Sequence, residues 1–380
     1  MESWTLNNAK PYMLVLVAIV SLITPFIKRT GNTLRNGQGS LNSRNIDSSI
    51  LLCVIAYLIY IVFCVGKRVD LGIGSMDAYA YRENFYSAAC SYSRFILDIS
   101  SFEWGYSTVV WVVRQITSNY AVLLTLWYTI SFYYILKFLC YTEQGGLSVL
   151  RVVVAAMTLL SQMNTMRMSI AIALSLNVLI QIGKKRWVSA LVFSFLAISV
   201  QISSVIILPI VFVEMTVASS QQRRARKILM IILVSVLLIY ASIPLLEKYV
   251  ASTDKRVYLG ASSLALGSYS AAAITILGTY RHRIAMTHNG WLNTTLMIAL
   301  PCIFLCVPLQ LAISVMYRLT LYFSLITITL MIGLAVNQAE GDRLSKMLWV
   351  ALSVGYVAIQ VYDFATVTTS YFGIYSNILF

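Results

Sequence analysis

Three arginines of this chain stand at the edges of apolar runs, where a charged side chain is costly and is by default a candidate for function. Arg167 lies one helical turn after Asn164, and Arg318 lies one turn before Tyr322. Arg114, in the sequence VVRQ, is a third cation of this kind. Guanidinium groups bind phosphate oxygens in pairs and stabilise the charge that develops on a leaving diphosphate, so these arginines predict a site for a lipid-linked diphosphate. We expect Asn164 and Tyr322 to contact the same substrate, and the alternative for each arginine is a side chain that only reaches the lipid headgroups.

Aromatic and acidic residues concentrate in residues 76–106. Nine of these 31 residues are aromatic, against 12% of the whole chain. Aromatic faces stack on sugar rings while neighbouring polar groups meet the hydroxyls, so the segment predicts a sugar platform. An aromatic belt at the membrane surface is the alternative, but a belt does not need the interleaved charges. Asp77 and Glu103 are the candidate bases for an acceptor hydroxyl. The expected sugar-binding residues of this segment are Tyr79, Tyr81, Arg82 and Tyr106.

A polar cluster interrupts one long apolar run, residues 187–218. The basic sequence KKR precedes this run and RRARK follows it. If both basic clusters are cytoplasmic, the chain must leave and return between them, so we expect a helical reversal at VQISS, residues 200–204. Irregular backbone at membrane depth is tolerated where it is buried in protein or faces a cavity. Gln201 and Ser204 are therefore candidates for substrate contact, and a purely structural hinge is the alternative.

The composition predicts an all-α integral membrane protein. Of the 380 residues, 59% are hydrophobic and only 11% are charged, which is too little charge for the surface of a soluble domain. Repeated apolar runs of roughly 17–20 residues predict membrane-spanning helices. The net charge of +14 is interpreted as an excess of lysine and arginine in cytoplasmic loops, and not as binding to nucleic acid. The expected spans are 11–27, 50–66, 120–140, 147–163, 167–183, 187–200, 202–218, 228–246, 262–279, 291–307, 317–336 and 346–362.

These spans form one transmembrane domain over residues 1–380, a polytopic bundle of about twelve helices with both termini outside. The first apolar run lacks a basic leader and a cleavage site, so it is interpreted as a retained span. The longest external loop covers residues 67–118. Two basic clusters on the same side of the membrane must be separated by an even number of crossings. The other spans already give an even number, so the moderately apolar residues 104–118 are not needed as a crossing. We therefore expect a helix that lies along the outer face of the membrane.

Neither a metal site nor a cofactor is expected. The six cysteines form no CxxC pair, and the two histidines, His282 and His288, lie in a basic loop. The chain has no glycine-rich nucleotide-binding loop, which fits a reaction outside the cytoplasm.

The order of the motifs resembles the EpsG/Wzy-type family of bacterial polysaccharide polymerases, which are membrane glycosyltransferases with a GT-C-like fold. The resemblance covers about residues 50–330. The motifs that carry it are MDAYAYRENF at 76–85, EWGY at 103–106, NTMR at 164–167, VQISS at 200–204 and YRLTLYF at 317–323.

The resemblance implies transfer of a growing glycan from undecaprenyl diphosphate onto a lipid-linked repeat unit, at the outer face of the bacterial cytoplasmic (inner) membrane. The products of the family are O-antigen, capsule or exopolysaccharide. The implied partners are undecaprenyl-diphosphate-linked oligosaccharides, membrane lipids and, by analogy, a polysaccharide chain-length regulator. Many relatives carry a histidine where this chain has Gln201. Glutamine cannot accept a proton at neutral pH, so we expect Gln201 to orient the substrate and Asp77 or Glu103 to act as the base.

Two other functions use similar residues. An O-antigen ligase, or another outer-face transferase with a lipid donor, would need almost the same site and differ in its acceptor. A flippase or transporter of lipid-linked oligosaccharides would be expected to show an inverted repeat and ionisable groups near the membrane midplane. The chain shows no obvious repeat, and its polar groups gather toward one side, so the polymerase is preferred.

Overall fold

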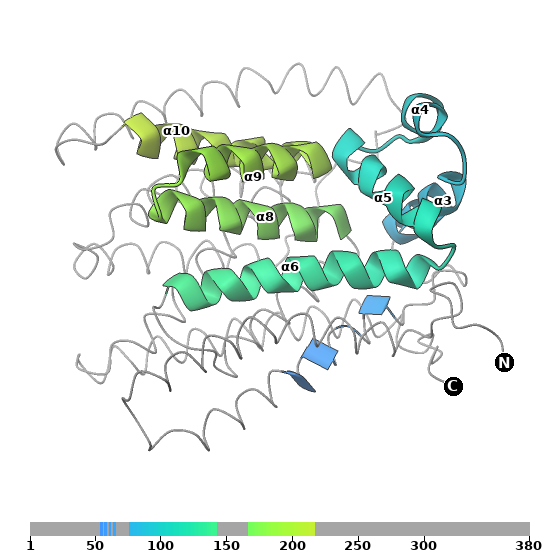
Figure 1. Ribbon diagram of the computed structural model, residues 1–380, viewed down its shortest axis with the longest axis horizontal. Coiled ribbons are helices and arrows are strands. Elements are labelled where there is room, and N and C mark those ends of the chain that lie inside the picture. Colours follow the sequence, from blue (N-terminus) through green and yellow to red (C-terminus); the bar gives the residue numbers. More distant parts are fainter. Residues whose placement is uncertain are drawn as a thin grey trace, which may run out of the picture. The chain divides into compact units, whose positions relative to one another are not determined.

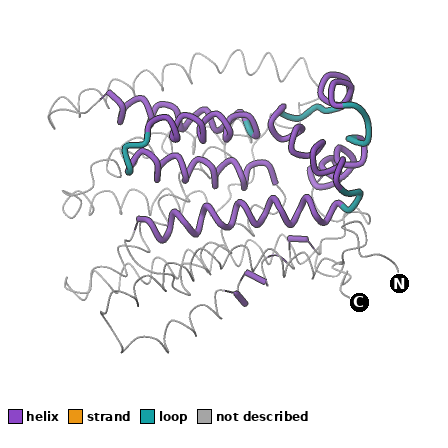
Figure 2. The backbone as a smooth tube through the Cα atoms, viewed as in Figure 1, coloured by secondary structure: helices purple, strands orange, loops and turns teal. Residues whose placement is uncertain are grey.

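The computed structural model of the chain describes residues 76–142 and 166–216, with seven further helical residues between 54 and 65. Within these ranges the regular structure is entirely helical and contains no strand, and short loops join the helices (Figures 1 and 2). The all-α class is therefore confirmed for the part of the chain that is described. The predictions for Asn164, Arg318 and Tyr322 lie outside the described residues, as do seven of the twelve expected spans.

The external segment and the helices after it have the following bounds. The elements in chain order are α3 (Met76–Ser87), α4 (Tyr92–Arg94), the π-helical turn η2 (Phe95–Ile99), α5 (Trp104–Ile116), α6 (Tyr120–Thr142), α8 (Met166–Gly183), α9 (Trp187–Val200), the 3-10 segment η3 (Ile202–Ile207) and α10 (Leu208–Thr216).

Two of these helices, α6 and α8, are long and apolar enough to cross a membrane. They match the spans expected at 120–140 and 167–183. Helix α9 has the bounds expected for the span at 187–200, and it is a shorter apolar helix. The regular helix ends at Val200, where the polar sequence VQISS was expected to interrupt it, and η3 follows.

The contacts of the chain divide it into two compact units. The first contains the described residues between 54 and 65, 76–142, 166–177 and 195–202, and the second contains 178–194 and 203–216. In the first unit, α3, α4, η2 and α5 gather at one end of the long helix α6 (Figure 1). Asn119 caps α6, because its side-chain oxygen accepts the backbone N–H of Ala121 at 3.0 Å.

Helices α6 and α8 are joined by polar contacts between their buried faces. The indole of Trp127 donates to the carbonyl oxygen of Met166 at 2.8 Å, and the Ser131 and Ser169 hydroxyls are 3.4 Å apart. Small residues allow helix backbones to approach closely, and hydrogen bonds between spans replace those that lipid cannot provide. These contacts fix the start of α8, which carries Arg167, against α6.

The second unit contains the turn between α8 and α9. Lys185 adopts a left-handed conformation with φ of 56°, the position that glycine usually takes at the end of a helix. The N–H of Arg186 bonds to the carbonyl of Gln181 at 2.9 Å, and that of Lys185 to Ile182 at 2.8 Å. This hydrogen-bond pattern ends α8 and turns the chain at KKR.

Candidate active site

An ion pair joins the external segment to the start of α8. Glu103 directly precedes α5, and Arg167 is the second residue of α8, so the pair connects residues 64 positions apart in the sequence. Nη1 of Arg167 donates to Oε2 of Glu103, and Nε of Arg167 donates to the hydroxyl of Tyr81 at 3.3 Å. The other carboxylate oxygen, Oε1, accepts the backbone N–H of Ile202 at 3.4 Å. The carboxylate thus binds two segments that the sequence places far from it.

Aromatic rings surround the guanidinium group of Arg167. Its central carbon lies 4.5 Å from the ring centre of Phe102, 5.7 Å from Tyr81 and 6.0 Å from Tyr106. The three rings also contact one another, with centres 5.3 to 5.6 Å apart. Ring faces attract a cation, and more strongly when water is excluded. We call these residues the Arg167 cluster: Tyr81, Phe102, Glu103, Tyr106 and Arg167.

The Arg167 cluster remains partly open to solvent. The side chains of Arg167 and Glu103 are 16% and 21% exposed. A guanidinium has five N–H groups, and two of those of Arg167 have partners within the described residues. Three N–H groups are left for the oxygens of a ligand, and the ion pair holds the fork in a fixed orientation.

Tyr106 carries a buried hydroxyl at the base of the cluster. Its side chain has no exposed surface, and its ring contacts Trp127 edge-on, with ring centres 5.2 Å apart. The hydroxyl has no hydrogen-bond partner among the described residues. Burial raises the pKa of Tyr106 well above its usual value, since the phenolate would lose its hydration. Tyr106 is therefore a neutral, buried hydroxyl in the folded protein.

A close backbone contact sets the distance between α5 and the end of α9. A Cβ on Gly105 would lie 2.3 Å from Oγ and 2.7 Å from Cβ of Ser199, and 2.8 Å from its carbonyl carbon. Only glycine fits there. The contact is reinforced by the rings of Trp104 and Phe195, whose centres are 5.6 Å apart. Because Glu103 stands two residues before Gly105, this contact places its carboxylate beside the N–H of Ile202.

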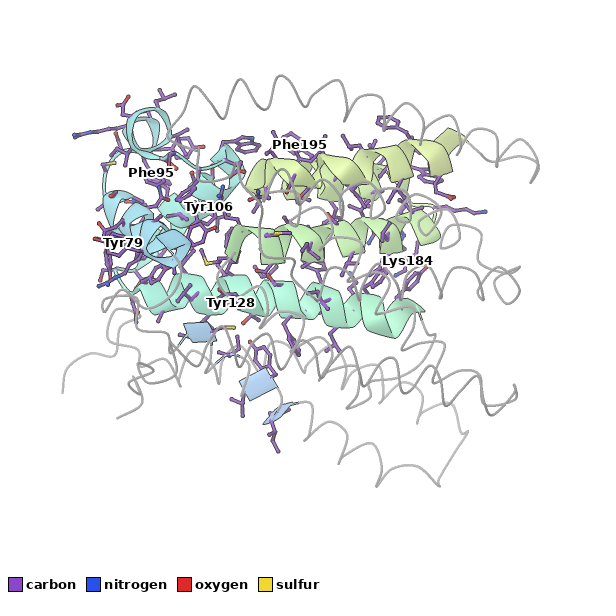
Figure 3. The ribbon with its side chains drawn as sticks, turned by 180° about the vertical axis from the view of Figure 1, so that it is seen from behind. Tyr79, Phe95, Tyr106, Tyr128, Lys184 and Phe195 are labelled. Carbon is purple, nitrogen blue, oxygen red and sulfur yellow. The ribbon has the colours of Figure 1, made fainter. Side chains whose placement is uncertain are left out.

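The structure brings together four of the site residues expected from the sequence: Glu103, Arg167, Tyr81 and Tyr106. Tyr81 and Tyr106 are buried, whereas Tyr79 on α3 is 53% exposed (Figure 3). Asp77 belongs to α3, one turn before Tyr81.

The other expected residues whose side chains the structure describes lie outside the Arg167 cluster. Arg114 stacks on Phe85, with its guanidinium carbon 5.7 Å from the ring centre, and Arg82 lies 5.6 Å from the ring centre of Tyr86. Gln201 is buried beside Ile202 in the first unit, and Ser204 is buried within η3 in the second.

Three features of the site escaped the sequence analysis. Phe102 is the ring nearest to Arg167, the N–H of Ile202 binds Glu103, and Gly105 touches Ser199. The glycine inside EWGY was the available signal, because glycine at the start of a helix suggests close approach of another backbone. Nothing in the sequence marks a backbone N–H.

The composition, the helical structure and two helices that are long and apolar enough to cross a membrane support a helical membrane protein. The family model of the EpsG family matches residues 50–377, and the chain belongs to the EpsG family. This is a family of glycosyltransferase-like polysaccharide polymerases, so membership supports an enzymatic role. No curated protein and no solved structure matches the chain.

Proposed function

We propose that this protein is a polysaccharide polymerase of the outer face of the bacterial cytoplasmic membrane. It transfers a growing glycan from undecaprenyl diphosphate onto a repeat unit carried by a second undecaprenyl diphosphate. A hydroxyl oxygen of the acceptor sugar bonds to the anomeric carbon of the donor glycan. The bond from that carbon to the diphosphate oxygen breaks, the hydroxyl proton passes to a base, and undecaprenyl diphosphate leaves.

The observation that carries the proposal is the Arg167 cluster in a member of the EpsG family. A diphosphate is a good leaving group, so the reaction needs charge stabilisation more than proton donation to the leaving oxygen. An oriented guanidinium, three of whose N–H groups have no partner among the described residues, provides that stabilisation. The site lies at the first turn of α8, a helix apolar enough to span the membrane, which is where the headgroup of a lipid donor would be presented.

We assign a role to each residue of the cluster. Arg167 binds the diphosphate of the donor, and Glu103 keeps the guanidinium in position through its ion pair. Tyr106 offers its unpartnered hydroxyl to a sugar or phosphate oxygen, and the exposed ring of Tyr79 stacks on a sugar. Gln201, buried beside the N–H that binds Glu103, orients the substrate.

The base and the remaining substrate contacts complete the proposal. Asp77 is the preferred base, since Glu103 is held by Arg167 and by the N–H of Ile202. Arg318 adds a second charge to the diphosphate. The remaining proposed substrate contacts are Asn164, Tyr322 and Ser204.

The proposed setting is a polytopic bundle of about twelve transmembrane helices with a GT-C-like arrangement and its active site on the periplasmic side. In that setting α5 lies along the outer surface of the membrane. It has one buried face, with Tyr106, Val110 and Val113, while Trp104 and Ile116 are 50% and 63% exposed. Apolar side chains on the outer face of a helix favour contact with lipid. A chain-length regulator is the proposed protein partner, by analogy with the family.

Deleting the gene in its host distinguishes a polymerase from a ligase and from a flippase. A polymerase-null strain is expected to accumulate single lipid-linked repeat units on the outer face of the membrane. Accumulation of lipid-linked polymer would instead indicate a ligase, and accumulation of repeat units on the inner face would indicate a flippase. Complementation with Arg167→Ala is expected to leave the defect uncorrected, whereas complementation with the control Arg94→Gln corrects it.

A further inference from the structure

We propose that Arg82 and Arg114 form a second phosphate-binding site, separate from the Arg167 cluster. Its ligand is the diphosphate of the acceptor, the second lipid-linked substrate of the reaction. The assignment of the acceptor rests on the proposed function, whereas the binding of a phosphate-bearing anion rests on the geometry of the two arginines.

The two arginines stack on two neighbouring rings. The guanidinium carbon of Arg82, on α3, is 5.6 Å from the ring centre of Tyr86, and that of Arg114, on α5, is 5.7 Å from the ring centre of Phe85. The two ring centres are themselves 5.5 Å apart. Two helices thus bring two cations to one pair of rings. Stacking on a ring covers the face of a guanidinium and leaves its edge, which carries the N–H groups, free to bind an anion in its plane.

Neither cation has an anionic partner among the side chains that the structure describes, which do not include that of Asp77. Glu103 is bonded to Arg167 and to a backbone N–H, and Glu83, which follows Arg82 on α3, is exposed and forms no ion pair there. Nε of Arg114 is buried and has no acceptor in the described part of the chain. A buried donor without an acceptor destabilises the protein until a ligand supplies one. Phosphate oxygens are strong acceptors that match the arginine fork.

The pair is displaced from the Arg167 cluster along both helices. Arg114 follows Tyr106 by eight residues on α5, a rise of about 12 Å at 1.5 Å per residue. Phe85 follows Tyr81 by four residues on α3, a rise of about 6 Å. The two groups of arginines also contact different rings. They are therefore two positions for anions, one to two helical turns apart.

Two positions are what the proposed reaction requires. Donor and acceptor each carry a diphosphate, and like charges repel. Holding the two diphosphates apart allows the anomeric carbon of one glycan and a hydroxyl of the other to meet between them. Binding both substrates in a fixed orientation contributes to rate by making the reaction effectively unimolecular.

The test is a titration of the full-length protein in nanodiscs of neutral lipid, with farnesyl diphosphate as the probe and calorimetry as the readout. Wild type is expected to bind two equivalents. Arg82→Gln combined with Arg114→Gln removes one equivalent, and Arg167→Gln removes the other. The matched control is Arg94→Gln, an exposed arginine of α4, and it binds as wild type does. Arg82→Gln alone, on the half-exposed member of the pair, is expected to weaken the same site at least tenfold, which keeps the test valid if the double variant does not fold.

The other outcomes distinguish failure of the second site, failure of the proposed function and failure of the assignment to the acceptor. One equivalent in wild type, lost with Arg167→Gln and kept in the double variant, overturns the second site and leaves the proposed function standing. Two equivalents in the double variant have the same consequence. No binding by wild type contradicts the proposed function itself. If nanodiscs of phosphatidylglycerol abolish the second equivalent, the arginines bind lipid headgroups, and the assignment to the acceptor is overturned.

Discussion

Replacing Gly105 by alanine tests how the structure positions Glu103. The new Cβ would overlap Ser199, at 2.3 Å from its Oγ, 2.7 Å from its Cβ and 2.8 Å from its carbonyl carbon. Side-chain rotation can move the hydroxyl, but it cannot move the carbonyl carbon, so α5 and the end of α9 must separate. The hydrogen bond between Glu103 and the N–H of Ile202 is already 3.4 Å long and is lost when they do.

The expected size of the effect follows from two opposing contributions. Overpacking of this kind destabilises a protein by about 1–3 kcal/mol. Alanine stabilises the helix by about 1 kcal/mol relative to glycine, so the net loss in the free energy of unfolding is expected to be about 0–2 kcal/mol. The loss of activity should be larger, because a misplacement of about 1 Å near reacting groups can reduce the rate about 100-fold. We therefore expect a variant that inserts and remains folded but makes little long-chain polysaccharide.

The assay compares four proteins: wild type, Gly105→Ala, Ser199→Gly and the double variant. Thermal unfolding in detergent reports stability, and the ladder of glycan lengths in a complemented null strain reports activity. Ser199→Gly removes Oγ and Cβ, the two atoms nearest to the new Cβ. Gly105→Ala should therefore cost less stability when it is added to Ser199→Gly than when it is added to wild type. Ser101→Ala, at an exposed position in the loop between η2 and α5, is the control. A normal ladder and melting temperature for Gly105→Ala, or additive effects in the double variant, would refute the reasoning.

Four further predictions concern the cluster and its support. Glu103→Gln should reduce the free energy of unfolding by about 1–3 kcal/mol, between the values for exposed and buried ion pairs, and a double-mutant cycle with Arg167→Gln that shows no coupling would contradict the pair. Tyr106→Phe should preserve or raise stability, because it removes a buried hydroxyl that has no partner in the described part of the chain, yet shorten the glycan ladder; equal ladders would contradict a role for the hydroxyl. The raised pKa of Tyr106 implies that the folded state keeps a proton that the unfolded state loses near pH 10, so wild type should lose more stability than Tyr106→Phe above about pH 10. Trp127→Phe should destabilise the start of α8 by about 0.5–1.5 kcal/mol, since the carbonyl of Met166 loses its bond to the indole but keeps the Ser169 hydroxyl as a donor, and unchanged thermal unfolding would show that the indole bond is dispensable.

The apolar helices could be predicted from the sequence to within two residues of their ends. Runs of hydrocarbon side chains between basic clusters predicted spans at 120–140, 167–183 and 187–200, and the helices found are Tyr120–Thr142, Met166–Gly183 and Trp187–Val200. The helix expected at 104–118 is found at Trp104–Ile116. These features depend on local composition, which a sequence shows directly.

The pairing of the charged residues could not be predicted in this way. Arg167 and Glu103 were each identified as candidates, but as a phosphate ligand and a base, and not as partners in one ion pair. Their contact depends on Trp127 holding the start of α8 and on Gly105 meeting Ser199, both of which join segments far apart in the chain. The external segment was expected to present its rings to a sugar, whereas Tyr81 and Tyr106 are buried around Arg167. Ring composition alone does not tell which aromatic side chains pack inward.

Reconstitution of the purified protein tests whether it polymerises lipid-linked repeat units and whether Arg167 is required. Proteoliposomes would be supplied with the undecaprenyl-diphosphate-linked repeat unit extracted from a polymerase-null strain of the host, and the products resolved by gel and mass spectrometry. We expect a ladder of glycans at multiples of the repeat, with one undecaprenyl diphosphate released for each bond formed, and no ladder with Arg167→Ala. A ladder of equal length from the Arg167→Ala protein, or intact repeat units as the sole product of wild type, would contradict it.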